Sequence, residues 1–273
     1  RGGIKMSKKI VALWILIMSV LLLQGCLVKS AKESVFTEGS SSMEKVIGML
    51  GESFQNETNV NFTYNPTGSS SGINGVLEGR CDIGLSSRKL TEDEKKDGLK
   101  ETILAYDGIV VIVNKENPIS DLSLDDIGKI YKGEITNWSE LGGKNEKIVL
   151  IGREAGSGTR EGFEGELNIK GLCKYRQELT STGDIITAII NNPGAIGYAS
   201  LASVKDTVKV MTVDGVKATE MAIRDGSYPL QRPFILVTNS ENSLTSSTEK
   251  FMEYIMSKEA RELILKAGVV PAN

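Results

Sequence analysis

Residues 148–160 read IVLIGREAGSGTR, and the predicted fold depends on the pattern in this stretch. Its aliphatic start predicts a buried strand, and Gly156-Ser157-Gly158-Thr159 is typical of a turn that begins a helix. A helix N-terminus presents unpaired N–H groups and about half a positive charge, which together attract anions. Arg153, just before the turn, adds a full positive charge. The stretch therefore predicts a strand–turn–helix unit that can bind an anion.

The same arrangement occurs twice more, earlier in the chain. Gly39-Ser40-Ser41-Ser42 precedes a predicted helix, and Gly68-Ser69-Ser70-Ser71-Gly72 lies between the alternating residues 60–64 and a second, short helix. Glycine lets the backbone approach an oxyanion closely, and serine adds a hydroxyl donor. For any single turn the alternative is a serine that only caps its own helix. Three such turns and an arginine favour a site for a tetrahedral oxyanion, which needs donors from several directions.

Strand-like and helix-like segments alternate along the chain, which predicts an α/β fold with mostly parallel sheets. Further strands are expected at residues 82–85, 109–113, 195–200 and 234–238. Further helices are expected after a capping box at Thr91, from Leu124 to Lys132 after Ser123, from Asp184 to Asn191, and twice near the C-terminus. No turn has the lysine of a P-loop or the G-x-G-x-x-G spacing, so nucleotide binding is poorly supported.

The composition narrows the possible functions. The 273 residues are 40% hydrophobic and 25% charged, as in a globular protein with one large core or two smaller ones. Residues 1–25 hold four basic residues and no acid, so the net charge of −3 becomes −7 for the rest, which argues against nucleic-acid binding. Histidine is absent from the sequence, which removes Ser-His-Asp catalysis and histidine-ligated zinc. We expect no enzymatic activity, no metal and no cofactor.

The N-terminal region predicts export and a lipid anchor. A basic pair precedes an apolar stretch, residues 10–23, that is short for a membrane span and typical of a signal peptide. It ends in Leu23-Gln24-Gly25-Cys26, which resembles the lipobox of bacterial lipoproteins, where the cysteine carries a diacylglycerol. We therefore assign residues 1–25 to a signal peptide with upstream residues, and 26–33 to the lipidated Cys26 and its tether. An ordinary secretory signal is the alternative. The protein is expected on the extracytoplasmic face of the cell membrane.

Taken in order, the motifs resemble the phosphate-binding proteins of bacterial high-affinity phosphate ABC transporters. Besides the three turns, the resemblance rests on DIGLSSR at 82–88, AYDG at 105–108, ITNW at 135–138 and PGAIGY at 193–198. It implies a two-lobed periplasmic-binding-protein-like fold (type II), in which each lobe is a mixed, mostly parallel sheet flanked by helices. Two crossover strands, at 109–113 and 234–238, would join the lobes. Lobe I would comprise residues 34–112 plus 234–273, and lobe II residues 113–233.

The resemblance also implies which residues bind phosphate. They are hydroxyl and N–H donors from both lobes together with one arginine: Ser41, Ser42, Ser69, Arg153, Ser157, Gly158 and Thr159. Arg153 would make the charge-assisted contact, and Glu154 or Glu161 is the expected partner of its guanidinium.

One position departs from the family pattern. Some members have a carboxylate where this chain has Ser87, and that carboxylate accepts a hydrogen bond from protonated phosphate and repels sulfate. We keep Ser87 in the predicted site and take Asp107 as the substitute acceptor. A turn residue before Gly108 is the alternative role for Asp107. The neighbouring Arg88 is expected to pair with an acid, and a contact with the ligand is the alternative.

The sequence fits two main classes of function. The first is a monomeric binding protein that closes on phosphate and delivers it to the transmembrane permease of an ABC transporter, with sulfate or molybdate as alternative ligands. The second is a secreted phosphatase with a serine nucleophile, which would need a base or a metal to activate the hydroxyl. The absence of histidine favours the binding protein. An adhesin or sensor on the same fold is a third option. The sequence leaves open whether Cys81 and Cys173 pair.

Overall fold

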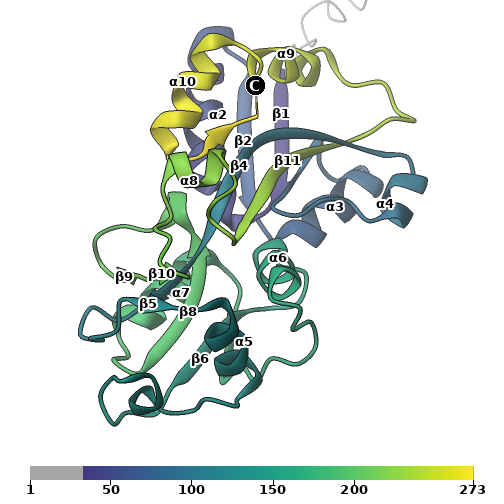
Figure 1. Ribbon diagram of the computed structural model, residues 1–273. Coiled ribbons are helices and arrows are strands. Elements are labelled where there is room, and N and C mark those ends of the chain that lie inside the picture. Colours follow the sequence, from purple (N-terminus) through teal and green to yellow (C-terminus); the bar gives the residue numbers. More distant parts are fainter. Residues whose placement is uncertain (1–32, 273) are drawn as a thin grey trace, which may run out of the picture. The chain divides into compact units, whose positions relative to one another are not determined.

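The computed structural model describes residues 33–272, and Figure 1 shows them with the labels used below. Residues from Ser34 onward form one compact unit. The predicted signal peptide at 1–25, Cys26 and nearly all of the predicted tether lie outside the described residues. Within residues 33–272, no helix has both the length and the apolar character that a membrane span requires.

Ten strands of the described chain build one continuous sheet, in the order β2-β1-β3-β11-β4-β8-β6-β7 with β9 and β12 added on β4. Their bounds are β1 (Ser34–Gly39), β2 (Asn61–Pro66), β3 (Ile83–Ser86), β4 (Leu99–Val113), β6 (Val149–Arg153), β7 (Gln177–Leu179), β8 (Ala195–Ser200), β9 (Lys209–Val210), β11 (Gln231–Asn239) and β12 (Val270–Pro271). A separate parallel pair consists of β5 (Asp121–Leu122) and β10 (Thr212–Val213).

Helices connect most of these strands. The α-helices are α2 (Glu44–Thr58), α3 (Ser69–Leu77), α4 (Glu92–Lys96), α5 (Leu124–Lys132), α6 (Gly158–Glu166), α7 (Thr182–Ile190), α8 (Glu220–Arg224), α9 (Ser246–Tyr254) and α10 (Lys258–Ala267). Short 3-10 helices are η2 (Ser41–Met43), η3 (Trp138–Leu141) and η4 (Leu201–Ser203).

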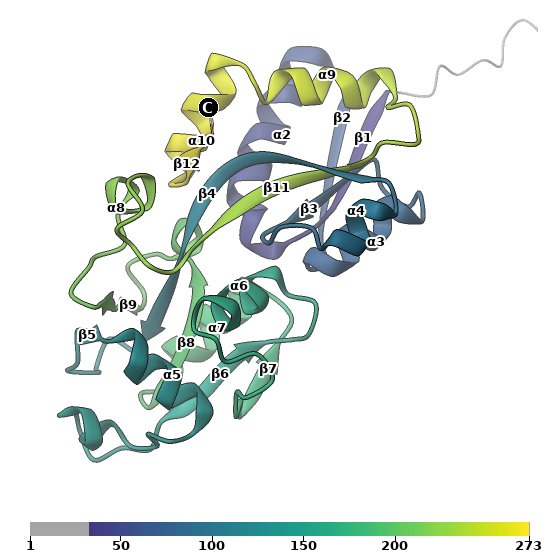
Figure 2. The same ribbon diagram turned by 45° about the vertical axis from the view of Figure 1, so that its right-hand side comes forward.

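The strand pairing divides the sheet into two parallel regions. β1 pairs in parallel with β2 and β3, and β6 pairs in parallel with β7 and β8. Between these regions run β4 and β11, which pair antiparallel along the whole of β11. Figures 1 and 2 both show these two long strands side by side. The predicted α/β fold with two lobes joined by two crossover strands is confirmed, and the predicted crossover segments lie inside β4 and β11.

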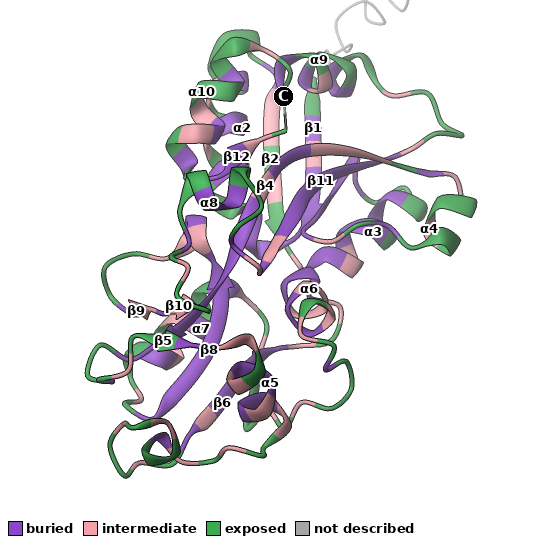
Figure 3. Cartoon of the chain, in the orientation of Figure 1, coloured by how far each residue is buried: buried purple, intermediate pink, exposed green. Residues whose placement is uncertain are grey.

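Hydrophobic side chains gather in two large clusters, one for each parallel region. The first contains Phe54 and Phe234, and the second contains Tyr131 and Phe163. β4 contributes to both, because Leu104 and Ala105 pack in the first cluster and residues 109–113 pack in the second. Figure 3 shows β8 and the lower part of β4 as largely buried, whereas the edge strand β2 is intermediate or exposed. The exact lobe boundaries at 112/113 and 233/234 stay a prediction.

Local sequence signals set several helix ends as predicted. The Thr91 capping box is present, because the Thr91 hydroxyl accepts from the N–H of Glu94 while the Glu94 carboxylate accepts from the N–H of Thr91. Ser123 caps α5, which ends at Gly133 in the left-handed conformation. The helix predicted to begin at Asp184 begins two residues earlier. Its cap is Ser181, whose hydroxyl accepts from the N–H of Asp184.

The two cysteines of the described chain are both free thiols and do not form a disulfide with each other. Cys81 is buried and Cys173 is half-buried. Burial raises the pKa of Cys81 to about 12 and that of Cys173 to about 11, which keeps both thiols protonated and unreactive at neutral pH.

Gly39, at the end of β1, tests how tightly the first turn is built. Its φ is +142°, and a Cβ there would lie 2.0 Å from the carbonyl oxygen of Leu85. We expect Gly39→Ala to lower the free energy of unfolding by about 3 kcal/mol, through backbone strain and this clash. Urea denaturation measures the change.

Gly48→Ala is the matched control, because Gly48 is exposed on α2 and a Cβ there would meet no atom within 4 Å. That variant should gain about 0.5–1 kcal/mol from helix propensity. A Gly39→Ala protein as stable as the wild type would contradict the close packing of this turn.

Candidate functional site

All three predicted turns join a strand to a helix, and they meet at one junction between the lobes. β1 leads into η2 and α2, β2 leads into α3, and β6 leads into α6. Because β1 and β2 are parallel neighbours, their carboxyl ends lie at the same edge of the sheet. The third turn reaches this edge from the other lobe, where the N–H of Ser70 donates to the carbonyl of Gly156 at 3.1 Å. The junction thus combines helix starts from both lobes.

Four buried serines on the lobe I side form what we call the serine cluster: Ser40, Ser42, Ser69 and Ser87. The Ser40 hydroxyl lies 2.8 Å from the hydroxyls of both Ser42 and Ser87. The Ser69 hydroxyl lies 3.3 Å from that of Ser87 and accepts from the Ser87 N–H at 3.1 Å. Ser87 and Ser69 therefore lie together. Ser40 is an addition to the predicted residues, which sequence reasoning passed over although it stands in the quoted turn.

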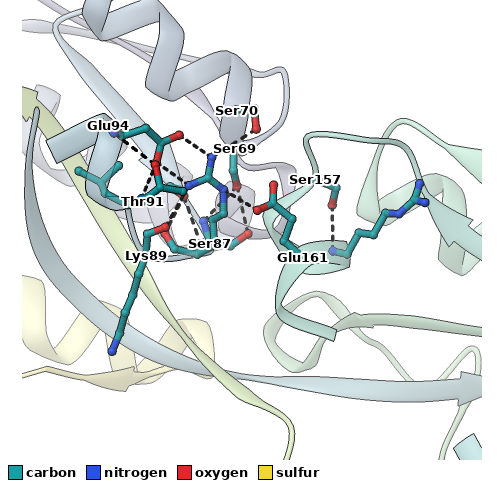
Figure 4. Close-up of polar contacts among 12 residues, drawn as sticks. Ser69, Ser70, Ser87, Lys89, Thr91, Glu94, Ser157 and Glu161 are labelled. Atoms are coloured by element: carbon teal, nitrogen blue, oxygen red, sulfur yellow. Dashed lines mark hydrogen bonds and ion pairs between the residues drawn. The ribbon is translucent and has the colours of Figure 1, made fainter. Parts of the chain in front are cut away.

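The first turn of α6 faces the serine cluster. A Cβ on Gly158 would meet the hydroxyl oxygens of Ser69 and Ser87 at 2.4 and 2.7 Å, so only glycine fits here without displacing them. The Thr159 hydroxyl donates to that of Ser42 at 3.4 Å. Ser157 caps its own helix, since its hydroxyl accepts from the N–H of Arg160 (Figure 4).

Ser41 and Thr182 make a second contact across the junction. The Ser41 hydroxyl accepts from the N–H of Thr182 at 3.2 Å, at the N-terminus of α7. The Thr182 hydroxyl in turn accepts from Nη1 of Arg153 at 3.3 Å. Sequence reasoning missed Thr182, although Ser181-Thr182-Gly183 is the same kind of small polar helix start as the three turns. A fourth helix N-terminus therefore borders the site.

Arg153 lies at the end of β6 and is only 2% exposed. The expected partners Glu154 and Glu161 do not hold its guanidinium. Instead it donates to the carbonyl oxygens of Leu179 at 3.2 Å and Thr180 at 2.7 Å. No carboxylate of residues 33–272 lies within ion-pair distance of it. Burial lowers the pKa of the Arg153 guanidinium, because the charged form has lost its water.

Arg88 pairs with acids, as predicted. Its guanidinium lies 2.7 Å from the Glu94 carboxylate and 3.1 Å from that of Glu161 on α6. The Glu161 contact is an ion pair without the alignment of a hydrogen bond. Figure 4 shows Glu161 beside Ser157 and Glu94 beside Thr91. Glu161 thus belongs to an ion pair that links the lobes.

Asp107, on β4, is fully buried and both of its carboxylate oxygens have partners. Oδ1 accepts from the Ser200 hydroxyl at 3.0 Å, and Oδ2 accepts from Nη2 of Arg232 at 3.1 Å. Burial raises the pKa of Asp107, and the charge of Arg232 opposes that rise. Arg232 also donates to the Thr159 hydroxyl at 2.6 Å. Sequence reasoning missed Arg232, because a single arginine before a predicted strand carries no local signal.

The charges at the junction do not balance. Of its two fully buried arginines, Arg232 has a carboxylate partner, and Arg153 has none among residues 33–272. A buried charge without a partner is costly, so this junction favours an anion. A separate hollow of about 560 Å³ is lined by aliphatic residues such as Leu150 together with polar and basic ones such as Lys147 and Gln177, and it contains none of the donors described above.

Two lobes, two crossover strands and a polar junction between them define the class of substrate-binding proteins. A model of the PBP superfamily domain matches residues 28–259. The phosphate-binding protein PstS of Borreliella burgdorferi is 30% identical over 275 residues, which cover 96% of this chain and 98% of that protein.

Solved structures agree with this class. A phosphate-bound substrate-binding protein from Clostridium perfringens, assigned to a phosphate ABC transporter, is 39% identical with a TM-score of 0.84 over 88% of this chain and all of that one. An ABC-type phosphate transport receptor from Vibrio cholerae is 31% identical with a TM-score of 0.72 over 86% and 99%. The chain belongs to the PBP superfamily and, within it, to the family of the phosphate-binding proteins PstS.

Thr182→Val tests the contribution of the α7 N-terminus. The variant nearly keeps the side-chain volume but removes the hydroxyl that receives the Arg153 guanidinium. We expect phosphate affinity to fall about three- to tenfold, because one hydrogen bond contributes about 1 kcal/mol. Calorimetric titration measures the affinity. Thr187→Val, on the exposed side of the same helix, should bind as the wild type does. Equal affinity for both variants would exclude Thr182 from the site.

Proposed function

We propose that this protein binds inorganic phosphate outside the cytoplasm and delivers it to the permease of a phosphate ABC transporter. The observation that carries the proposal is the buried guanidinium of Arg153, which lacks a carboxylate partner among residues 33–272 and lies beside hydroxyl donors from both lobes. The PstS relatives and the phosphate-bound structure support the same ligand. An incoming oxyanion would exchange hydroxyl–hydroxyl contacts for shorter and stronger contacts to a charged acceptor.

The proposed ligand residues come from both lobes: Ser41, Ser42, Ser69, Ser87, Asp107, Arg153, Ser157, Gly158 and Thr159. With lobe I at 34–112 plus 234–273 and lobe II at 113–233, phosphate touches donors of both lobes only when the lobes are closed. A ligand shifts a conformational equilibrium by its differential affinity, so phosphate would favour the closed form. In this scheme Asp107 is the candidate acceptor for a phosphate proton.

We propose a receptor and not a phosphatase. The relatives are named as binding and transport proteins. A serine nucleophile needs an adjacent base, whereas the cluster serines contact other hydroxyls and backbone N–H groups. No histidine is present in the sequence to act as that base.

Isothermal titration of the protein with phosphate, arsenate and sulfate tests the function. We expect stoichiometric binding of phosphate and arsenate without turnover, and little binding of sulfate. Sulfate binding equal to phosphate binding would remove Asp107 as the proton acceptor. Failure to bind phosphate would contradict the function itself.

Arg153→Ala locates the site in the same titration. We expect phosphate affinity to fall at least tenfold, about 1.4 kcal/mol, because a buried charge-assisted contact is lost. Arg176→Ala removes an exposed arginine of the same lobe and should leave the affinity unchanged. If Arg153→Ala bound phosphate as tightly as Arg176→Ala, the site would lie elsewhere.

The proposed membrane attachment rests on Cys26 within Leu23-Gln24-Gly25-Cys26. A diacylglycerol on its thiol carries two acyl chains, which would give stable anchoring, whereas a single chain gives only marginal binding. In a bacterial host expressing the full chain, the wild type should fractionate with membranes, and Cys26→Ser should be soluble or remain unprocessed. A Cys26→Ser protein that is processed and membrane-bound like the wild type would favour another mode of attachment.

A further inference from the structure

We propose that Arg232 is a positioning residue that fixes the Thr159 hydroxyl as a donor toward phosphate, and that Asp107 holds Arg232 in place. The inference rests on the proposed phosphate site and gives Asp107 a task besides the one considered above. It concerns a residue outside the predicted ligand set.

Arg232 lies at the start of β11, directly opposite Asp107 on β4. It is 3% exposed, and its guanidinium packs over the Phe234 ring at 5.3 Å. Nη1 donates to the Thr159 hydroxyl at 2.6 Å, and Nη2 donates to Asp107 at 3.1 Å. The buried Nε has no hydrogen-bond partner in the described part of the chain. One buried arginine therefore connects both crossover strands to the first turn of α6.

This contact limits what the Thr159 hydroxyl can do. A hydroxyl has one hydrogen and two lone pairs, whereas a guanidinium is a donor only. Because Arg232 occupies one lone pair, the Thr159 hydrogen must point away from Arg232. Its acceptor in the structure is the Ser42 hydroxyl at 3.4 Å, a long contact. A phosphate oxygen in this direction would be a better acceptor, because it is charged. The cation behind the hydroxyl also strengthens its donation, since hydrogen bonds in a chain polarise one another.

Asp107 keeps Arg232 in this arrangement. The carboxylate is itself held by the Ser200 hydroxyl, which donates to it at 3.0 Å. Its charge compensates the buried guanidinium, which would otherwise be costly. The chain of contacts therefore runs from Asp107 through Arg232 and Thr159 to the anion.

A double-mutant cycle on phosphate affinity tests the inference. Arg232→Met and Thr159→Val should each weaken phosphate binding about tenfold, and the double variant should be little weaker than either single one, because the arginine acts through that hydroxyl. When Thr159 is intact, Arg232→Lys, which keeps the charge and one donor nitrogen, should have a phosphate affinity within about threefold of the wild type. When Thr159 is already replaced by Val, adding Arg232→Lys should not change the phosphate affinity further. Arg224→Met, which replaces an exposed arginine, is the control and should bind phosphate with the wild-type affinity.

If Arg232→Met does not fold, as judged by circular dichroism, the cycle is run with Arg232→Lys. Its loss of phosphate affinity must then be absent in the double variant with Thr159→Val. Losses that multiply in the double variant, or wild-type affinity for Arg232→Met, would overturn the inference. These outcomes differ from failure of the proposed function, in which the wild type itself would not bind phosphate.

Discussion

The guanidinium of Arg153 is buried at the end of a strand, and within residues 33–272 all of its hydrogen-bond acceptors are carbonyl and hydroxyl oxygens. A buried cation in such surroundings is stabilised when an anion binds beside it. The rest of the junction supplies what an oxyanion needs besides charge. Hydroxyls and helix N-termini converge on the junction from both lobes, and the fold of the protein brings them together.

Parallel strand pairing places these donors close together. In each lobe the carboxyl ends of parallel strands lie at one edge of the sheet, and each strand leads there into a helix start. β4 and β11 cross between the lobes, so the two edges face one junction. Asp107 and Arg232 pair with each other on these crossover strands, and Arg232 donates to Thr159, which couples the joint between the lobes to the proposed ligand site.

Sequence reasoning predicted the parts of the site that local chemistry encodes. The three glycine–serine turns, the caps at Thr91 and Ser123, and the apolar strands at 109–113 and 234–238 all have short-range signals, and the structure shows them. That these two strands cross between the lobes was implied by the family resemblance. Partners that depend on long-range packing could not be predicted. Arg153 was expected to pair with Glu154 or Glu161, but Glu161 pairs with Arg88, 73 residues away in sequence, across the junction. Arg232 is similar, because only the pairing of β11 with β4 brings it to Asp107. Thr182 had a local signal, the small polar helix start at 181–183, but it was missed because α7 was predicted to begin at Asp184, two residues too late.

A crystal structure of the protein with phosphate is the most direct test of the central idea, that an anion compensates Arg153 where the helix starts of both lobes meet. The predicted result is one phosphate with an oxygen within about 3 Å of the Arg153 guanidinium and with further oxygens accepting from Ser41, Ser69 and the N–H groups that begin α6. Phosphate bound at another place, with the Arg153 guanidinium still held only by carbonyl and hydroxyl oxygens, would contradict it.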